Sequence, residues 1–154
     1  LRFGRPSWPV FIAPERSFII GKADKMIDGK DVTIFATGHM VWEAIEAESI
    51  LAEKGVSVEL INIHTIKPLD VEAILASIQK TGCAVTVEEH QINGGLGDSV
   101  AQVFSRFHPA PIEMVAVNDS FGESGTPTQL LKKYGLDKEN IVKAVERVLA
   151  RKGK

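Results

Sequence analysis

The sequence is poor in several features that would otherwise point to a class of protein. It holds one cysteine, Cys83, among 154 residues. An internal disulfide is therefore excluded, and we expect a reducing compartment, the cytoplasm. No apolar run approaches the ~20 residues that a membrane-spanning helix needs, and the first residues do not follow a signal-peptide pattern. The net charge of −2 comes from interspersed acidic and basic residues, without the basic stripe that binds nucleic acid or an anionic membrane.

What the sequence does contain is typical of one folded domain. Apolar residues make up 44% and charged residues 25%, as in ordinary globular proteins, and this length can bury a substantial core. The sequence opens at Leu1 rather than at a methionine, and we expect it to be a piece of a longer protein. Residues 1–17 hold three prolines and no steady hydrophobic period. They are predicted to form an extended arm or linker, with the domain itself at 18–154.

The domain alternates between strand and helix patterns. Short runs rich in β-branched residues predict buried strands at 31–37, 56–62, 83–89 and 112–118, with a weaker candidate at 22–27. Helical periodicity lies between and after them, at 40–54, 71–80, 97–107, 127–134 and 138–151. This alternation predicts parallel pairing and a three-layer α/β/α sandwich.

Single residues mark several helix ends. Asp70 is placed to cap the helix over 71–80, and Gly55 to end the helix over 40–54. Thr126, Pro127 and Gln129 combine an N-cap, a proline at the first helical position and a capping-box glutamine.

Residues 94–97 are glycine-rich and follow a predicted strand, as phosphate-binding loops do. The dinucleotide fingerprint requires G-x-G-x-x-G, but Gly95-Leu96-Gly97 is followed by Asp98, Ser99 and Val100. Asp98 also places negative charge in the first turn of the helix, where a phosphate would otherwise sit. No G-x-x-x-x-G-K-[ST] motif occurs. We therefore expect these glycines only to let the chain turn tightly and pack closely.

The preceding residues, Glu88-Glu89-His90, have two interpretations. They lie at the carboxyl end of a predicted parallel strand, where ligands bind in open α/β sheets, and a histidine beside carboxylates can act as an acid or base. Alternatively, successive strand residues point to opposite faces, so Glu88 and Glu89 do not line one site. We favour the second interpretation, a hydrogen-bonded edge or interface.

The remaining histidines offer a weaker hypothesis. His39 and His64 also follow predicted strands, so they and His90 could meet at one edge of the sheet and bind zinc. No recognised ligand spacing links the three, which argues against it. His108 lies in the loop before Pro109.

Two possible nucleophiles are also weak candidates. Ser99 lies near His90 and Asp98, but the G-x-S-x-G elbow of the hydrolases is missing. Cys83 begins a buried strand and is expected in the core.

Three longer motifs carry more information. They are T-I-K-P-L-D at 65–70, V-E-E-H-Q-I-N-G-G-L-G-D-S-V at 87–100 and S-G-T-P-T-Q-L-L-K-K-Y-G-L-D at 124–137. In this order they resemble the C-terminal domain of transketolase. Residues 29–70 are similar to the opening strand–helix–strand unit of that domain, and the similarity runs from about Arg5 to Val148.

The resemblance implies a mixed five-stranded sheet with one antiparallel strand, a role that suits residues 22–27. It also implies a homodimeric parent enzyme with a diphosphate-binding, a pyrimidine-binding and a C-terminal domain. Such an enzyme uses thiamine diphosphate and Mg²⁺ or Ca²⁺ to move a two-carbon ketol unit between sugar phosphates, as in the pentose phosphate pathway.

The resemblance also indicates what this stretch of chain does within the parent. It lacks the family's G-D-G metal motif and the glutamate that activates the thiamine ring, so we expect it to be inactive by itself and to bind no cofactor or metal. Gly4-Arg5-Pro6 occupies the place of an S-R-P motif whose arginine grips the sugar phosphate. Arg5 is therefore the substrate-binding candidate, although Gly4 replaces the serine, and Arg2 is a nearby spare cation.

The resemblance assigns residues 88–97 to the family's strand-to-helix turn, facing the rest of the dimer. Two other functions stay open. One is the same domain in a 2-oxo acid dehydrogenase β subunit or a deoxyxylulose-phosphate synthase, and the other is a non-catalytic binding module. The S-G-T-P stretch at 124–127 favours transketolase.

Overall fold

A five-stranded sheet lies at the centre of the computed structural model, which describes residues 8–153. The strand order is β1-β3-β2-β4-β5. The strands are β1 (Asp24–Ile27), β2 (Val32–Ala36), β3 (Val58–Asn62), β4 (Ala84–Gln91) and β5 (Ile112–Val117). β1 pairs antiparallel with β3, and the other three pairings are parallel. The expected mixed sheet is confirmed, with residues 22–27 supplying the antiparallel strand.

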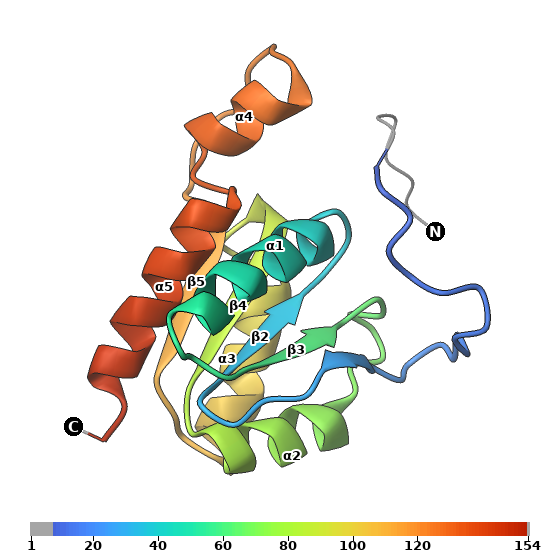
Figure 1. Cartoon of the computed structure of the whole chain (residues 1–154), viewed down its shortest axis with the longest axis vertical. Helices are drawn as coiled ribbons and strands as arrows, with labels where there is room; N and C mark the ends of the chain where they lie inside the picture. Colours follow the sequence, from blue (N-terminus) through green and yellow to red (C-terminus); the bar gives the residue numbers. More distant parts are fainter. Residues whose placement is uncertain (1–7, 154) are drawn as a thin grey trace.

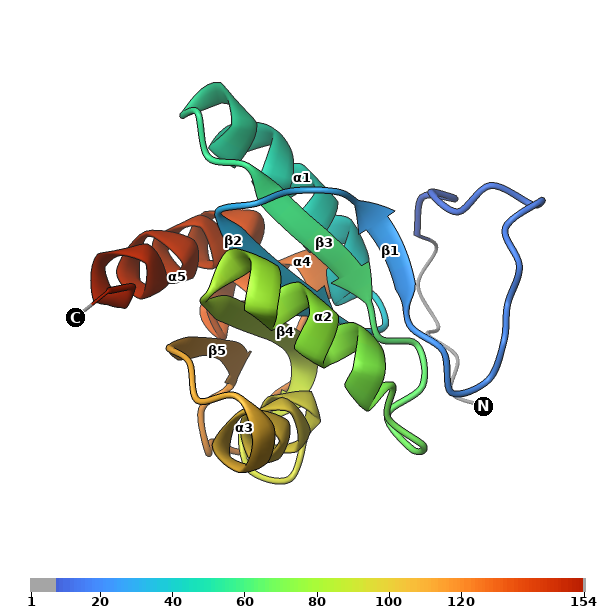
Figure 2. The ribbon, with the colours of Figure 1, turned by 90° about the horizontal axis from the view of Figure 1, so that it is seen from below.

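Helices cover both faces of the sheet, which confirms the three-layer sandwich. They are α1 (Met40–Glu53), α2 (Val71–Thr81), α3 (Leu96–Phe107), α4 (Pro127–Lys133) and α5 (Lys138–Arg151). α1 and α5 lie on one face, and α2 and α3 on the other (Figures 1 and 2). The short α4 stands beyond the end of α5 (Figure 1) and holds no buried residue.

Each face of the sheet has its own hydrophobic core. Ile34 of β2 packs in the cluster under α1 and α5, whereas its neighbour Phe35 packs in the cluster under α2 and α3. Both side chains are fully buried, because successive strand residues face opposite layers and both layers are covered. This double burial explains why the central strands appear in the sequence as continuous apolar runs.

The predicted helix ends are also formed. The Asp70 carboxylate accepts from the Ala73 N–H at 3.3 Å, and Gly55 has a φ of +80°. Gln129 Oε1 accepts from the Thr126 N–H at 3.2 Å, which is the reciprocal half of the predicted capping box. Asp70 also accepts from the Ala23 N–H at 3.0 Å, so the cap ties α2 to the segment that precedes β1.

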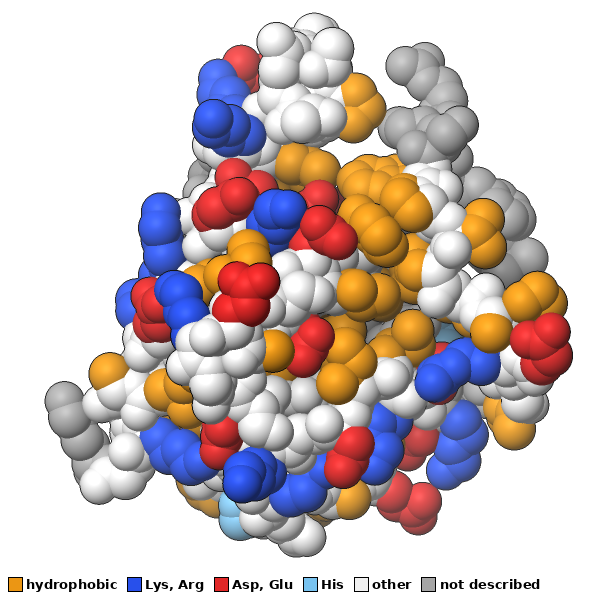
Figure 3. Space-filling view, viewed as in Figure 1, with side chains coloured by type: hydrophobic (Ala, Val, Ile, Leu, Met, Phe, Trp, Pro, Cys, Tyr) orange, Lys and Arg blue, Asp and Glu red, His pale blue; other side chains and the backbone are white. Residues whose placement is uncertain are grey.

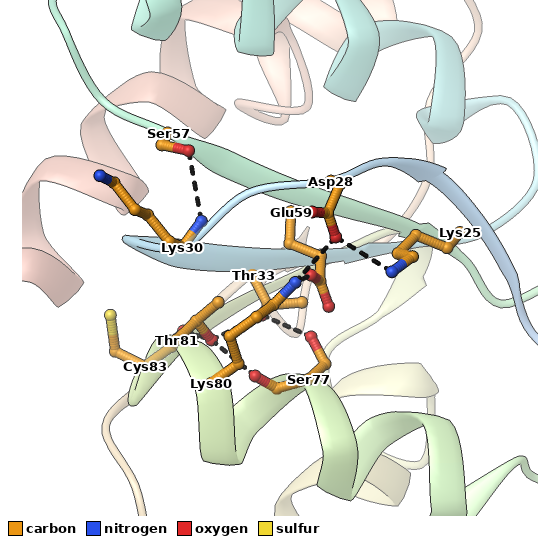
Figure 4. A network of polar contacts seen from close by, with 10 residues as sticks. All are labelled: Lys25, Asp28, Lys30, Thr33, Ser57, Glu59, Ser77, Lys80, Thr81 and Cys83. Carbon is orange, nitrogen blue, oxygen red and sulfur yellow. Dashed lines mark hydrogen bonds and ion pairs between the residues drawn. The ribbon is translucent and has the colours of Figure 1, made fainter.

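A polar network joins α2 to the sheet (Figure 4). The carboxylate of Glu59, on β3, is 3% exposed and pairs with Lys80 of α2. Lys80 also donates to Asp28 at 2.9 Å. Hydrogen bonds from Lys80, and then from Lys25, lower the pKa of Asp28. Lys80 is therefore the one cation that neutralises the buried Glu59 within the described network.

We expect Lys80→Ala to destabilise the fold because it leaves the Glu59 carboxylate buried without its partner. The loss in free energy of unfolding should be about 2 kcal/mol, less than for a fully buried pair, because the Lys80 side chain is 38% exposed. Urea unfolding measures it. Lys30→Ala is the matched control, since Lys30 bonds Ser57 through its backbone N–H, which alanine keeps. Equal stability of the two variants would contradict this role.

A second set of ion pairs holds α5 against the edge strand β5. Arg147 Nε donates to Glu113 at 3.0 Å, and Arg151 bonds the same carboxylate. Burial alone would raise the pKa of Glu113, but the hydrogen bonds from the two arginines outweigh it and lower the pKa. The charged carboxylate therefore contributes stability.

This lowered pKa predicts a pH dependence. The contribution of Glu113 is fully present above the ordinary glutamate pKa of about 4.3 and is lost as the pH falls through the lower folded-state pKa. Glu113→Gln should cost no more than about 1 kcal/mol at pH 7, because both arginines are half exposed. The difference in melting temperature between wild type and variant should shrink as the pH falls below the ordinary glutamate pKa of about 4.3. Glu53→Gln, at an exposed site of α1, serves as the control, and a difference that persists in acid would refute the assignment.

Candidate functional site

The carboxyl ends of three parallel strands meet at one edge of the sheet. After β2 the chain adds β3 on one side and then returns to place β4 on the other. In open α/β sheets, the crevice at such a reversal is where ligands bind. A cleft of about 400 Å³ lies there. It is lined by Phe11, Ile12, Thr37, Gly38, His39, Val41, Asn62, His64, Ile66, Glu89 and His90.

The three histidines expected at this edge do lie together in the cleft. His39 Nδ1 is 3.3 Å from Glu89 Oε2, His90 Nδ1 is 3.4 Å from Glu88 Oε2, and His64 Nδ1 bonds the Thr65 hydroxyl at 2.9 Å. Each ring thus has a separate polar neighbour. Among residues 8–153 no three potential ligands converge on a metal position. His108 lies away from the cleft, after the last residue of α3.

The N-terminal segment covers this edge. The Trp8 ring stacks on His39 with 4.7 Å between centroids, Phe11 contacts Trp42 at 5.9 Å, and Phe18 lies 4.4 Å from His64. Residues 8–23 contain neither helix nor strand, and Figure 1 shows them running past the sheet edge. The arm therefore supplies one wall of the cleft, through Phe11 and Ile12.

The glycine-rich turn after β4 is closed by the chain's own carboxylate. Glu88 is 1% exposed, and its two oxygens accept from the N–H groups of Leu96 and Gly97 at 2.8 Å each. A side chain on Gly95 would overlap this carboxylate. An anion already occupies the first turn of α3, so the phosphate-loop interpretation is wrong and the packing role of the glycines is confirmed.

Glu88 and Glu89 point to opposite faces, as the alternation of a strand predicts. Glu88 lies under α3, whereas Glu89 faces α1 and pairs with His39. The preferred interpretation of Glu88-Glu89-His90 as a hydrogen-bonded edge is therefore supported. Both oxygens of Glu88 are committed to holding α3.

Residues 21–141 match the family model described as transketolase, C-terminal domain. The chain belongs to this family. The transketolase resemblance of the three motifs is thereby confirmed.

Relatives and solved structures agree with the assignment. The chain is 45% identical to the 6-deoxy-6-sulfo-D-fructose transketolase subunit SqwH of Clostridium sp., over 88% of this chain and 42% of that protein. It is 39% identical to a subunit of the apulose-4-phosphate transketolase of Phocaeicola vulgatus, over 93% of this chain and 46% of that protein. A solved split-gene transketolase, described as an inactive β4 tetramer, superposes with a TM-score of 0.90 at 42% identity, over 94% of this chain and 47% of that one. The chain thus spans about half the length of these relatives.

Two polar residues of the cleft were not among the candidates that the sequence suggested. Thr37 and Asn62 line the cleft and are 7% and 5% exposed. The available signal was their position, since Thr37 directly follows β2 and Asn62 ends β3. Both residues fall within the predicted strands at 31–37 and 56–62, and a strand position by itself does not mark a polar side chain as part of a site.

The other sequence candidates fall outside the cleft. Ser99 donates to the Gly95 carbonyl at 3.0 Å, within the first turn of α3. Cys83 is buried, and this burial raises the pKa of its thiol, which keeps it in the unreactive form. Arg5, the predicted substrate contact, lies outside the described residues and stays a prediction.

The Glu88 contact predicts a non-additive pair of substitutions. Gly95→Ala should cost about 2 kcal/mol or more because its methyl group overlaps the carboxylate. Glu88→Ala should cost about 3 kcal/mol through the loss of two charged hydrogen bonds. The double variant should lose less than the sum, because the overlap is gone. Urea unfolding of all three checks this.

Gly122→Ala is the control for the Gly95 substitution. An added methyl group there meets nothing within 4 Å, so its effect should stay within about 0.5 kcal/mol. Strict additivity of Gly95→Ala and Glu88→Ala would contradict the contact.

Proposed function

We propose that the chain is the C-terminal domain of a split-subunit transketolase that transfers a two-carbon ketol unit between sugar phosphates in the cytoplasm. The observation that carries this is the match in fold and sequence to a split-gene transketolase, over 94% of this chain. Two curated relatives with 45% and 39% identity are named as transketolase subunits. The domain contributes to assembly rather than to bond making and breaking.

Thiamine diphosphate and its Mg²⁺ or Ca²⁺ belong, in this proposal, to the rest of the parent enzyme. The described residues do not fit these groups. The glycine turn at α3 is filled by the Glu88 carboxylate, and no cluster of metal-ligating side chains occurs within residues 8–153. We therefore place the diphosphate cradle and the metal site of this proposal outside residues 8–153.

Exposed apolar side chains support the assembly role. Phe18 and Ile20 in the arm are 63% and 73% exposed, and Phe121, before α4, is 97% exposed. Further hydrophobic side chains gather over α1, between the arm and α4 (Figure 3). Isolated apolar residues are common on surfaces, but a gathered set marks an interface. We propose that the other transketolase subunit and a second protomer cover this face.

A second candidate function rests on a different set of relatives. The chain is 40% identical to the 1-deoxy-D-xylulose-5-phosphate synthase of Syntrophotalea carbinolica, over 84% of this chain and 20% of that protein. Two assays separate the activities. We expect the full-length polypeptide, combined with its complementary subunit and thiamine diphosphate, to transfer ketol units from a ketose phosphate to an aldose phosphate without releasing CO₂. Release of CO₂ from pyruvate with glyceraldehyde 3-phosphate, and no ketol transfer, would establish the alternative instead.

Arg5 gives this proposal a residue-level test. In the assembled enzyme, Arg5→Ala should lower kcat/KM for phosphorylated donors at least about tenfold, because charge-assisted hydrogen bonds to the phosphate are lost. The loss should fall mainly on KM, since the phosphate is remote from the reacting carbonyl and is bound alike in the ground and transition states.

The matched control is Arg2→Ala, which removes a cation from the same arm. It should leave the kinetics unchanged. Equal losses on phosphorylated and unphosphorylated donors would remove Arg5 from the substrate site.

A further inference from the structure

We propose that the cleft at the carboxyl edge of the sheet binds a small oxyanion, the phosphate or carboxylate group of a metabolite. Three features of the cleft support it: the N-terminus of α1, two largely buried polar side chains that make no hydrogen bond within residues 8–153, and a lining with apolar and imidazole groups.

The N-terminus of α1 opens onto the cleft. α1 is 14 residues long, and its N-cap residue, His39, makes no side-chain capping bond. Gly38, just before it, has a φ of +61°, and a side chain there would meet nothing within 4 Å. The positive end of the helix dipole therefore lies at the cleft without a side-chain cap, which favours an anion.

Two largely buried polar side chains beside this helix end make no hydrogen bond within residues 8–153. Thr37 is 93% buried and Asn62 is 95% buried, and both line the cleft. Their polar atoms are not among those fully enclosed without a partner, so both remain accessible from the cleft. The Thr37 hydroxyl and the Asn62 amide are donors that suit oxygen atoms of a ligand.

Another threonine on the same strand shows the usual outcome. The Thr33 hydroxyl bonds Ser77 and Thr81 at 2.7 Å each, in the network under α2 (Figure 4). The hydroxyl of Thr37, four residues later, has no such partner within the described part of the chain. The two threonines differ in their surroundings. α2 packs against the strand at Thr33, whereas Thr37 lines the cleft.

The hydrogen-bond donors and the size of the cleft fit a small metabolite that carries an oxyanion. The imidazoles of His39, His64 and His90 line the cleft and can each donate an N–H, beside one carboxylate, Glu89, which pairs with His39. The volume of about 400 Å³ lies in the range of small-molecule sites. Phe11, Ile12 and Ile66 give one side of the cleft an apolar surface, which suits the carbon skeleton that carries the anion.

Calorimetry on the full-length polypeptide tests the site. Inorganic phosphate and acetate, titrated separately at constant ionic strength, distinguish a phosphate site from a carboxylate site, and glycerol is the neutral control. We expect one of the two anions to bind. Thr37→Val should weaken that binding about tenfold, by removing a hydrogen bond to a charged group. It should not lower the melting temperature measured without the anion, because no hydrogen bond among the described residues is lost.

Thr33→Val is the matched control. It removes the same hydroxyl from the same strand, so it should lower the melting temperature and leave anion affinity unchanged. Asn62→Asp, isosteric with the native residue, should abolish binding by placing a negative charge in the cleft. If Asn62→Asp fails to fold, the Thr37→Val and Thr33→Val pair decides the question.

The outcomes that overturn the site are distinct from a failure of the transketolase proposal. Binding that survives both Thr37→Val and Asn62→Asp but is lost in Arg5→Ala would place the anion at the substrate site alone. No heat from either anion would also overturn it. Absence of ketol transfer in the assembled enzyme would leave this test intact, because anion binding is measured without turnover.

Discussion

The carboxylate of Glu88, buried beneath the first turn of α3, fixes the course of the chain where β4 ends. Its two oxygens satisfy two N–H groups that the helix would otherwise leave without partners. The contact requires a glycine at 95, since any side chain there would overlap the carboxylate. One side chain therefore requires the glycine at 95, holds the first turn of α3 and places an anion at that helix end.

α1 differs from α3 in how the backbone N–H groups of its first turn are satisfied. α3 has its positive end neutralised from within, whereas α1 begins at the cleft with no side-chain cap. Both helices start at the carboxyl edge of the sheet, where β2 and β4 end next to each other. The strand order places the reversal of the chain at this edge, and within residues 8–153 the N-terminus of α1 begins at the cleft without a side-chain cap.

The arm forms part of the cleft at the carboxyl edge of the sheet. Trp8, Phe11 and Phe18 lay their rings against His39, Trp42 and His64. Residues of the arm thus form a wall of the cleft. The position of the arm therefore determines part of the shape of the cleft.

The sequence by itself determined nearly all the helices and strands, because the period of apolar residues and the caps at Asp70 and Gly55 are local properties. It also determined that Glu88 and Glu89 separate, since the alternation of a strand requires it. The antiparallel β1 followed only from the family resemblance, since four residues carry too little periodicity to decide their partner. Only the tertiary structure showed that Thr37 and Asn62 are buried without partners among the described residues while Thr33 is satisfied. Whether a buried hydroxyl finds a bond depends on which distant segments pack around it, and no local pattern records that.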